Sequence, residues 1–307
     1  MPLMNLPSAW YLIADSCEIP NHKPLALKRL GLNLVIWRHN EKVYALEDLC
    51  PHRSAKLSLG TIKAETIECP FHGFKYSALG NCIYVPETDK DAPNLCVKAF
   101  TVCEQNAFIF IKHGQPLDLN PPWFDALTKM TCYSGFTSLW PSHVTRCIEN
   151  QLDYAHLPYV HKTTIGKNID KNMQVKFEFT NQSIKMYTNA QNSTSTSFEF
   201  KFGNIWLLNI LPDKFTQFLA FVPIDEHNTK LYLRTYQNFL KIPVLKELLG
   251  LIFNQQSKII LNQDKRVVLS QRPLNSLESL NENLYPSDKG IIYFRQAWQK
   301  GIAKSDD

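Results

Sequence analysis

The sequence predicts an α+β protein with two domains. Its first third contains short β-type runs separated by turn residues, at 34–37, 43–46 and 107–111 among others. Beyond a proline-rich break, consecutive alternating runs favour an antiparallel sheet. A long helical stretch follows at about 244–270. We therefore expect an all-β domain, and after it a mixed domain that combines an antiparallel sheet with a long C-terminal helix.

The proline-rich break sets the domain boundary. The segment GQPLDLNPPW, 114–123, places three prolines within seven residues, and proline both fixes φ and removes a backbone donor. Regular structure cannot continue through it. The predicted organisation is a first domain over 1–113, a linker over 114–123 and a second domain over 124–307.

The second domain is predicted to begin with a helix at about 146–159. Alternating runs with short polar gaps then indicate successive strands, at 174–179, 183–188, 197–202, 204–211, 217–222 and 230–237. After the long helix, a last amphipathic helix is predicted near 289–302.

Composition excludes several functional classes. The 307 residues are 44% hydrophobic, which is enough for real cores. The net charge of +5 is spread along the chain, which argues against nucleic-acid binding, and no apolar run approaches the ~18 residues of a membrane span. The first residues do not resemble a secretory signal. The eight cysteines are therefore expected to be reduced thiols in a cytoplasmic protein.

Four residues form a first candidate metal site. They follow the spacing C-x-H, sixteen residues, C-x-x-H, and comprise Cys50, His52, Cys69 and His72. A structural zinc site with two Cys and two His is one interpretation, but C-x-H is unusual because zinc pairs are typically two to four residues apart. A [2Fe–2S] centre of the Rieske type, with two Cys on one iron and two His on the other, fits the pattern better.

At these residues the sequence resembles the Rieske family. The loops read CPHRSA and CPFHGF and have no additional Cys, so they are similar to the loops of Rieske ferredoxins and oxygenases. The neighbouring residues also belong to the oxygenase-like version, and they are Arg53, Phe71, Phe74 and Tyr76. Simple packing around a buried cluster is an equally good interpretation of these four. Such a cluster carries one electron and does no bond chemistry itself.

A second constellation lies in RCIENQLDYAHLPYVHK, 146–162. It contains Asn150, Asp153, His156 and His161 in the pattern N-x-x-D-x-x-H-x-x-x-x-H. On one helix Asp153 and His156 would share a face, with Asn150 one turn earlier. Pro158 would disturb the helix and let His161 turn back towards His156. Two neutral imidazoles so placed can bind a divalent transition metal.

A carboxylate is needed to complete a two-His, one-carboxylate iron site. Asp264, in the long helical stretch, is the best candidate because its apolar neighbours indicate a core-facing position, where an acid needs a partner or a metal. Glu247 and Asp225 are weaker candidates.

Both motifs in this order resemble the catalytic subunit of Rieske non-haem iron oxygenases, over nearly the full chain. The resemblance implies a helix-grip second domain with His156, His161 and Asp264 on a mononuclear Fe(II), and Asn150 supporting them. It implies that Asp153 connects this iron to the cluster of a neighbouring subunit in a head-to-tail ring, most often a trimer. A second interpretation is that Asp153 orients His156 from outside the ligand set, and both roles are compatible.

The resemblance implies a terminal oxygenase that takes electrons from a separate NAD(P)H-dependent reductase or ferredoxin. It would use O2 to hydroxylate or demethylate an aromatic or other apolar molecule, like the monooxygenases and O-demethylases acting on vanillate and dicamba. No G-x-G-x-x-G is present, so NAD(P)H oxidation is expected elsewhere. Two alternatives remain: a Rieske electron-transfer protein with a non-catalytic ligand-binding second domain, and a zinc-stabilised protein that binds a lipid or hormone-like ligand.

Overall fold

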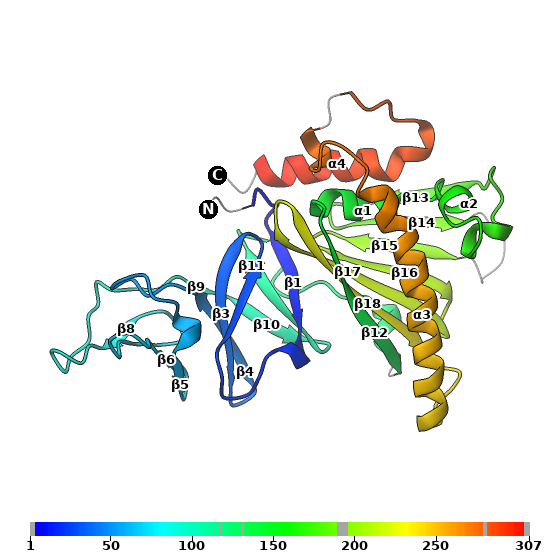
Figure 1. Cartoon of the computed structure of the whole chain (residues 1–307). Coiled ribbons are helices and arrows are strands. Elements are labelled where there is room, and N and C mark those ends of the chain that lie inside the picture. Colours follow the sequence, from blue (N-terminus) through cyan, green and yellow to red (C-terminus); the bar gives the residue numbers. More distant parts are fainter. Residues whose placement is uncertain (1–3, 117, 131, 189–195, 279–280, 304–307) are drawn as a thin grey trace. The chain divides into compact units, whose positions relative to one another are not determined.

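The computed structural model describes residues 4–116, 118–130, 132–188, 196–278 and 281–303. The predicted linker residue 117 lies outside these ranges. The chain divides into two compact units between Pro121 and Pro122, and residues 5–7 group with the second unit. Each unit is described separately below. Figure 1 shows both units with their elements labelled.

The first unit consists of three small antiparallel sheets. Their strand orders are β1-β11-β10, β2-β3-β4-β9 and β5-β6-β7-β8. The strands are β1 (Ala9–Asp15), β2 (Leu25–Arg29), β3 (Leu32–His39), β4 (Lys42–Glu47), β5 (Thr61–Lys63), β6 (Thr66–Glu68), β7 (Lys75–Tyr76), β8 (Cys82–Tyr84), β9 (Ala99–Phe100), β10 (Val102–Gln105) and β11 (Phe108–His113). Short 3-10 turns lie at Ser16–Glu18 and Leu57–Leu59. The all-β prediction for this part of the chain is confirmed.

The second unit is built on one seven-stranded antiparallel sheet. Its order is β12-β18-β17-β16-β15-β14-β13. The strands are β12 (Tyr133–Trp140), β13 (Val175–Phe179), β14 (Ser183–Thr188), β15 (Ser197–Lys201), β16 (Ile205–Leu211), β17 (Phe215–Asp225) and β18 (Asn228–Gln237). The six predicted strands are present in successive pairings, and β12 adds an edge strand that the sequence pattern did not indicate.

In the described part of this unit, four helices accompany the sheet: α1 (Val144–Leu152), α2 (Leu157–Val160), α3 (Pro243–Val268) and α4 (Lys289–Ala303). Short 3-10 turns lie at Asp125–Leu127, Ile165–Asn168, Ser276–Glu278 and Pro286–Asp288. The predicted α+β class, with a long helix near the C-terminal end, is confirmed.

The single helix predicted at 146–159 is wrong. The backbone leaves the helix at Asp153, which is extended at φ −88° and ψ 120°. Its Oδ1 accepts a hydrogen bond from the N–H of Ala155 at 2.7 Å, a side-chain turn that competes with helical bonding. Pro158 then stands in the first turn of α2, where a proline is well tolerated. Asp153 and His156 therefore meet across a turn instead of along one helical face.

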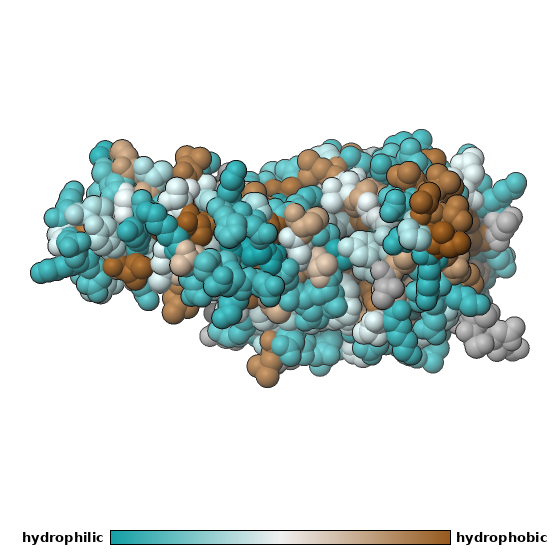
Figure 2. All heavy atoms as spheres, turned by 90° about the horizontal axis from the view of Figure 1, so that it is seen from below, coloured by the Kyte–Doolittle hydropathy of each residue, from teal (hydrophilic) through white to brown (hydrophobic). Residues whose placement is uncertain are grey.

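The long helix α3 packs against β12 and β18 (Figure 1). Its buried positions recur at helical spacing, and Ser257, Leu261, Asp264 and Val268 therefore share one face. Near the start of α3 several outward side chains are apolar and more than 40% exposed, as at Val244, Leu248 and Leu251. Figure 2 shows hydrophobic side chains gathering over this end of the helix. Within the described residues, no helix combines the length and apolar character that crossing a bilayer requires.

Candidate functional site

Two loops of the first unit share one backbone hydrogen-bond pattern. Cys50, in the loop after β4, donates its N–H to the carbonyl five residues later, and its carbonyl accepts from Ser54 N–H at 2.8 Å. Cys69, in the loop after β6, makes the same pair of bonds, with Gly73 in the place of Ser54. Both Ser54 (φ 55°) and Gly73 (φ 72°) adopt the left-handed region. The sequence thus folds each Cys/His pair into an equivalent tight turn.

The four side chains of these loops lie close together. The sulfurs of Cys50 and Cys69 are buried, whereas His52 is exposed and His72 is half-buried. The two imidazole rings are 4.7 Å apart between centroids. His72 Nδ1 is buried yet finds no hydrogen-bond partner in the described part of the chain, as expected for a ligand atom. This set of two buried sulfurs and two outer imidazoles fits a cluster with one Cys-held and one His-held iron.

Burial raises the pKa of the Cys69 thiol, and the adjacent Cys50 thiol raises it further against the lowering effect of the Phe71 and His72 backbone N–H groups. Two buried thiols side by side suit a metal centre, because a bound metal ion stabilises the thiolate form. The Tyr76 hydroxyl lies 3.2 Å from Cys50 Sγ. Tyr76 is therefore in contact with one proposed cluster ligand.

The aromatic neighbours of the loops fall into two groups. Phe74 is buried in the core and stacks on His52 at 4.6 Å between centroids. Phe71 is 54% exposed, next to His72, and the Arg53 guanidinium lies 5.2 Å from the centre of its ring. Phe74 and Tyr76 therefore pack against the site from the buried core, while Phe71 and Arg53 lie on the surface.

In the second unit, His156, His161 and Asp264 meet although Asp264 is about a hundred residues away in sequence. Asp264 Oδ1 lies 2.9 Å from His161 Nε2 and 3.4 Å from His156 Nε2. Nitrogen and oxygen ligands about 2.0–2.2 Å from a first-row metal ion lie about 3 Å apart when they occupy neighbouring positions. Among the described residues, the ligand atoms of His156, His161 and Asp264 all lie within 4.8 Å of one another, which is close enough to hold one metal ion. This geometry suits a facial three-ligand site.

The electrostatics of this group agree with a metal site. Burial by itself would raise the pKa of Asp264, but His156 and His161 outweigh it and lower that pKa. Burial lowers the pKa of His156, but Asp153 and Asp264 outweigh burial and raise it to about 9. A divalent ion would take the place of this proton and offset the same buried negative charge.

The remaining predicted residues surround the three. Asp153 Oδ2 lies 3.4 Å from His156 Nδ1, on the side away from Asp264, and its side chain is 27% exposed. Asn150 is half-buried at the end of α1, and its Nδ2 has no partner within the described residues. The weaker carboxylate candidates lie elsewhere: Glu247 is exposed at the start of α3, and Asp225, the last residue of β17, accepts hydrogen bonds from the turn that follows.

Gln263 is a residue that the sequence did not single out. Its Oε1 lies 2.8 Å from His161 Nδ1, so it fixes the orientation of the ring and directs Nε2 at Asp264. It also accepts a hydrogen bond from the Thr164 hydroxyl at 2.9 Å. No local pattern marks it, because a Gln beside an Asp on a helix is ordinary and the contact spans 102 residues.

Replacing Gln263 with Leu is expected to weaken metal binding at this site about 10–100-fold, the usual effect of losing the partner that orients a ligating His. Titration with Co(II), followed by its absorption spectrum, measures the affinity. Gln263→Glu keeps an acceptor for His161 Nδ1 and should retain most of the affinity. Equal losses in both variants would contradict the orienting role.

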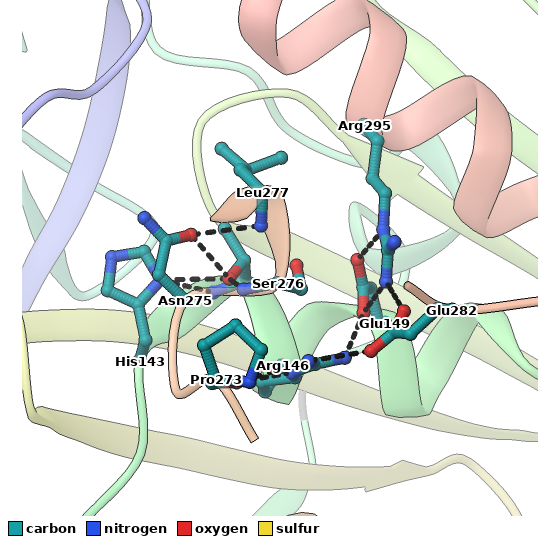
Figure 3. A network of polar contacts seen from close by, with 10 residues as sticks. His143, Arg146, Glu149, Pro273, Asn275, Ser276, Leu277, Glu282 and Arg295 are labelled. Carbon is teal, nitrogen blue, oxygen red and sulfur yellow. Dashed lines mark hydrogen bonds and ion pairs between the residues drawn. The ribbon is translucent and has the colours of Figure 1, made fainter. Parts of the chain in front are cut away.

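A buried polar network holds α1, the helix that precedes Asp153, in place (Figure 3). The Arg146 guanidinium donates to Pro273 O at 3.1 and 3.2 Å and pairs with Glu149 and Glu282. Arg295, from α4, pairs with the same two carboxylates. Because Arg146 and Glu149 are nearly inaccessible to solvent, the network fixes α1 against α4 and the segment that follows α3.

His143 caps the start of α1 in the same region: its Nδ1 accepts from Thr145 N–H. Burial, aided by the neighbouring positive groups, lowers the His143 pKa to about 4. In the unfolded chain the same histidine has a pKa of about 6.5 and therefore binds a proton more readily. The contribution of His143 to the free energy of unfolding is therefore expected to be fully present above pH ~6.5. It should fall by on the order of 3 kcal/mol as the pH approaches 4.

Urea unfolding of His143→Asn, which keeps a capping acceptor without the titration, should show a smaller drop between pH 7.5 and 5 than the unmodified chain. An identical drop in both proteins would exclude His143 as a cause.

Family models match both units. A Rieske [2Fe–2S] domain model matches residues 9–109, and the model of the vanillate O-demethylase oxygenase C-terminal domain matches residues 140–206. Together they include both loops of the first unit and the segment with Asn150, Asp153, His156 and His161.

Individual relatives give the same assignment. A putative toluene-4-sulfonate monooxygenase iron-sulfur subunit, TsaM2 of Comamonas testosteroni, is 32% identical over 53% of this chain, and this chain covers 48% of it. The chain thus spans about half the length of this curated relative. Methylxanthine N1-demethylase NdmA of Pseudomonas putida is 26% identical over 92% of this chain and 83% of the relative.

Solved structures show the same fold. Dicamba monooxygenase bound to 3,6-dichlorosalicylic acid has a TM-score of 0.82 at 19% identity, with 99% of each chain covered. NdmB of Pseudomonas putida CBB5 has a TM-score of 0.79 at 21% identity, over 96% of this chain and 94% of the other. With a Rieske domain, an oxygenase C-terminal domain and this fold, the chain belongs to the Rieske oxygenase family.

Proposed function

We propose that this protein is a terminal oxygenase component that uses O2 to hydroxylate or oxidatively demethylate a small organic molecule. One observation carries the proposal: His156, His161 and Asp264, from two distant segments, converge with their ligand atoms within 4.8 Å of one another. They line a cavity of about 390 Å³, so a substrate bound there lies beside the metal site. A buried carboxylate and two imidazoles next to a cavity provide three ligands and leave room for O2.

The cofactor assignments follow from the two sites. Cys50, Cys69, His52 and His72 would hold a Rieske [2Fe–2S] cluster, and His156, His161 and Asp264 would hold a mononuclear Fe(II). When bound, the cluster supplies single electrons and the iron supplies O2 activation. The chain positions these groups, because Gln263 and Asp153 orient the two imidazoles. Segment 1–113 is proposed as the cluster domain and 124–307 as the iron domain, joined by 114–123.

Electron delivery requires partners. His52 is exposed, which supports electron entry at that face of the cluster from a separate NAD(P)H-dependent reductase or ferredoxin. Asp153 contacts His156 on one side and is partly exposed on the other, which supports a contact with a cluster-ligating His of a second copy. A head-to-tail homotrimer is the proposed assembly. Because none of the eight cysteines forms a disulfide, a cytoplasmic location is proposed.

The reaction type is proposed from the relatives. Their names describe monooxygenases and demethylases, namely toluene-4-sulfonate monooxygenase subunits, a methylxanthine N1-demethylase and dicamba monooxygenase. Monooxygenation or demethylation is therefore proposed in preference to ring cis-dihydroxylation. An aromatic or other apolar molecule is the proposed substrate class.

The test is a panel of methylated and unsubstituted aromatic compounds, supplied with a generic reductase and NADH under air. The proposal expects O2 consumption coupled to a hydroxylated or demethylated product. If the cluster turns over electrons with the reductase but no compound in a broad panel yields product, the electron-transfer alternative replaces the oxygenase.

A further inference from the structure

The cavity beside His156, His161 and Asp264 has a largely apolar wall. It lies between the seven-stranded sheet and α3, and its volume of about 390 Å³ falls in the range of small-molecule sites. Side chains from β14, β15, β16 and β17 supply most of the apolar surface, together with the loop before β13: Met173, Met186, Phe198, Trp206, Leu208 and Leu219.

The described cavity wall contains acidic side chains but no Lys or Arg that could pair with an acidic substrate. Among the described residues, its carboxylates are Asp153 and Asp264, and neither Lys nor Arg lines it. The sequence between the wall residues Thr188 and Thr196 also contains neither Lys nor Arg. The nearby Arg146 and Arg295 are already paired with Glu149 and Glu282.

An organic anion entering such a site would lose its hydration without gaining a counter-charge, which is strongly unfavourable. A divalent ion at the His156, His161 and Asp264 site does not change this balance, because the two carboxylates Asp153 and Asp264 offset its two charges. The cavity therefore favours uncharged molecules.

One polar pair interrupts the apolar wall. Gln217, on β17, donates from Nε2 to the Oγ of Ser257, on α3, at 3.1 Å. Within the described residues the Gln217 amide makes no other side-chain hydrogen bond, so its Oε1 is available as an acceptor, and the Ser257 hydroxyl hydrogen is available as a donor. An acceptor next to a donor is complementary to an amide group, which presents an N–H and a C=O side by side.

We infer that this cavity selects an uncharged, largely apolar molecule bearing one amide-like group, which Gln217 and Ser257 hydrogen-bond, and that it rejects carboxylates and sulfonates. The inference rests on the proposed oxygenase function, since it specifies the substrate class of that site.

The test compares the binding of naphthalene-2-carboxamide and naphthalene-2-carboxylate, which have the same size and shape but differ in charge. Isothermal titration is done on the complete, cofactor-loaded protein at pH 7.5, without O2 or an electron donor. The carboxamide is expected to bind at least 10-fold more tightly. Equal or tighter binding of the carboxylate overturns the inference, and so does the failure of both compounds to bind.

Variants of two wall residues, Gln217 and Leu208, test which side chains set the preference for the carboxamide. Gln217→Leu should reduce carboxamide affinity about 10-fold and leave the affinity for 2-methylnaphthalene unchanged, whereas Gln296→Leu, on the exposed face of α4, should change neither. Leu208→Lys places a cation on the wall and should raise carboxylate affinity at least 10-fold. If Gln217→Leu binds the carboxamide as tightly as the unmodified protein does, the hydrogen-bonding role is wrong.

The two proposals can fail separately. A protein that binds the carboxamide but never couples O2 to a product supports the cavity inference and contradicts the oxygenase. Efficient turnover of a carboxylate substrate supports the oxygenase and overturns the cavity inference.

Discussion

Replacing Asp264 with Ala is expected to remove the mononuclear iron and to reduce turnover to the rate of iron-free protein. Asp264 is the sole carboxylate within reach of both His156 Nε2 and His161 Nε2 among the described residues, and two imidazoles alone do not complete the site. The cluster, whose proposed ligands all lie in the first unit, should be retained. Iron and acid-labile sulfide analysis, together with product formation, measures both effects.

Glu247→Ala is the matched control. Glu247 lies on the same helix and was itself a candidate ligand, but it is exposed at the start of α3. This variant should keep both metals and full activity. If Asp264→Ala retains turnover, or if it loses the cluster along with the iron, the assignment of Asp264 is wrong.

Replacing Arg146 with Met is expected to lower the free energy of unfolding by about 3–5 kcal/mol, the usual effect of removing one partner from a buried ion pair. The guanidinium is 2% exposed, and its loss leaves the Pro273 carbonyl without its donor and Glu149 with Arg295 alone. Because α1 leads into Asp153, activity should fall as well. Chemical denaturation measures the change.

Arg266→Met provides the comparison for this loss. Arg266 is exposed on α3, and an exposed substitution of this kind is usually within about 0.5 kcal/mol of neutral. A loss below about 1 kcal/mol in Arg146→Met would show that the buried network contributes little to the stability of the second unit.

The sequence was most informative where ligand chemistry and short spacing coincide. The C-x-H and C-x-x-H loops, and the His pair at 156 and 161, are visible because the proposed ligands lie within a few residues of one another. The antiparallel strands followed from period-2 alternation with short gaps, and α3 followed from its length and its buried face. Asp264 was identifiable because an acid at a core-facing helix position is unusual.

Other features depend on contacts that no local pattern encodes. The helix break at Asp153 results from a side-chain hydrogen bond to Ala155 that competes with helical bonding, although the segment has a helical sequence pattern. Gln263 acquires its role only when α3 comes next to α2. The network of Arg146, Glu149 and Arg295 likewise joins helices that are far apart in the chain. The edge strand β12 was missed because Gly135 and the serines beside it weaken its strand signal.

We propose above all that one chain holds two metal centres. A Rieske cluster would be bound by Cys50, His52, Cys69 and His72, and a separate iron by His156, His161 and Asp264. Electron paramagnetic resonance of the reduced protein, recorded with and without nitric oxide as a probe of the separate iron, tests this proposal most directly. We expect the low-g signal of a Rieske cluster in the unmodified protein and in Asp264→Ala, and an additional iron–nitrosyl signal in the unmodified protein alone. A protein without the Rieske signal, or an iron–nitrosyl signal that survives in Asp264→Ala, would contradict it.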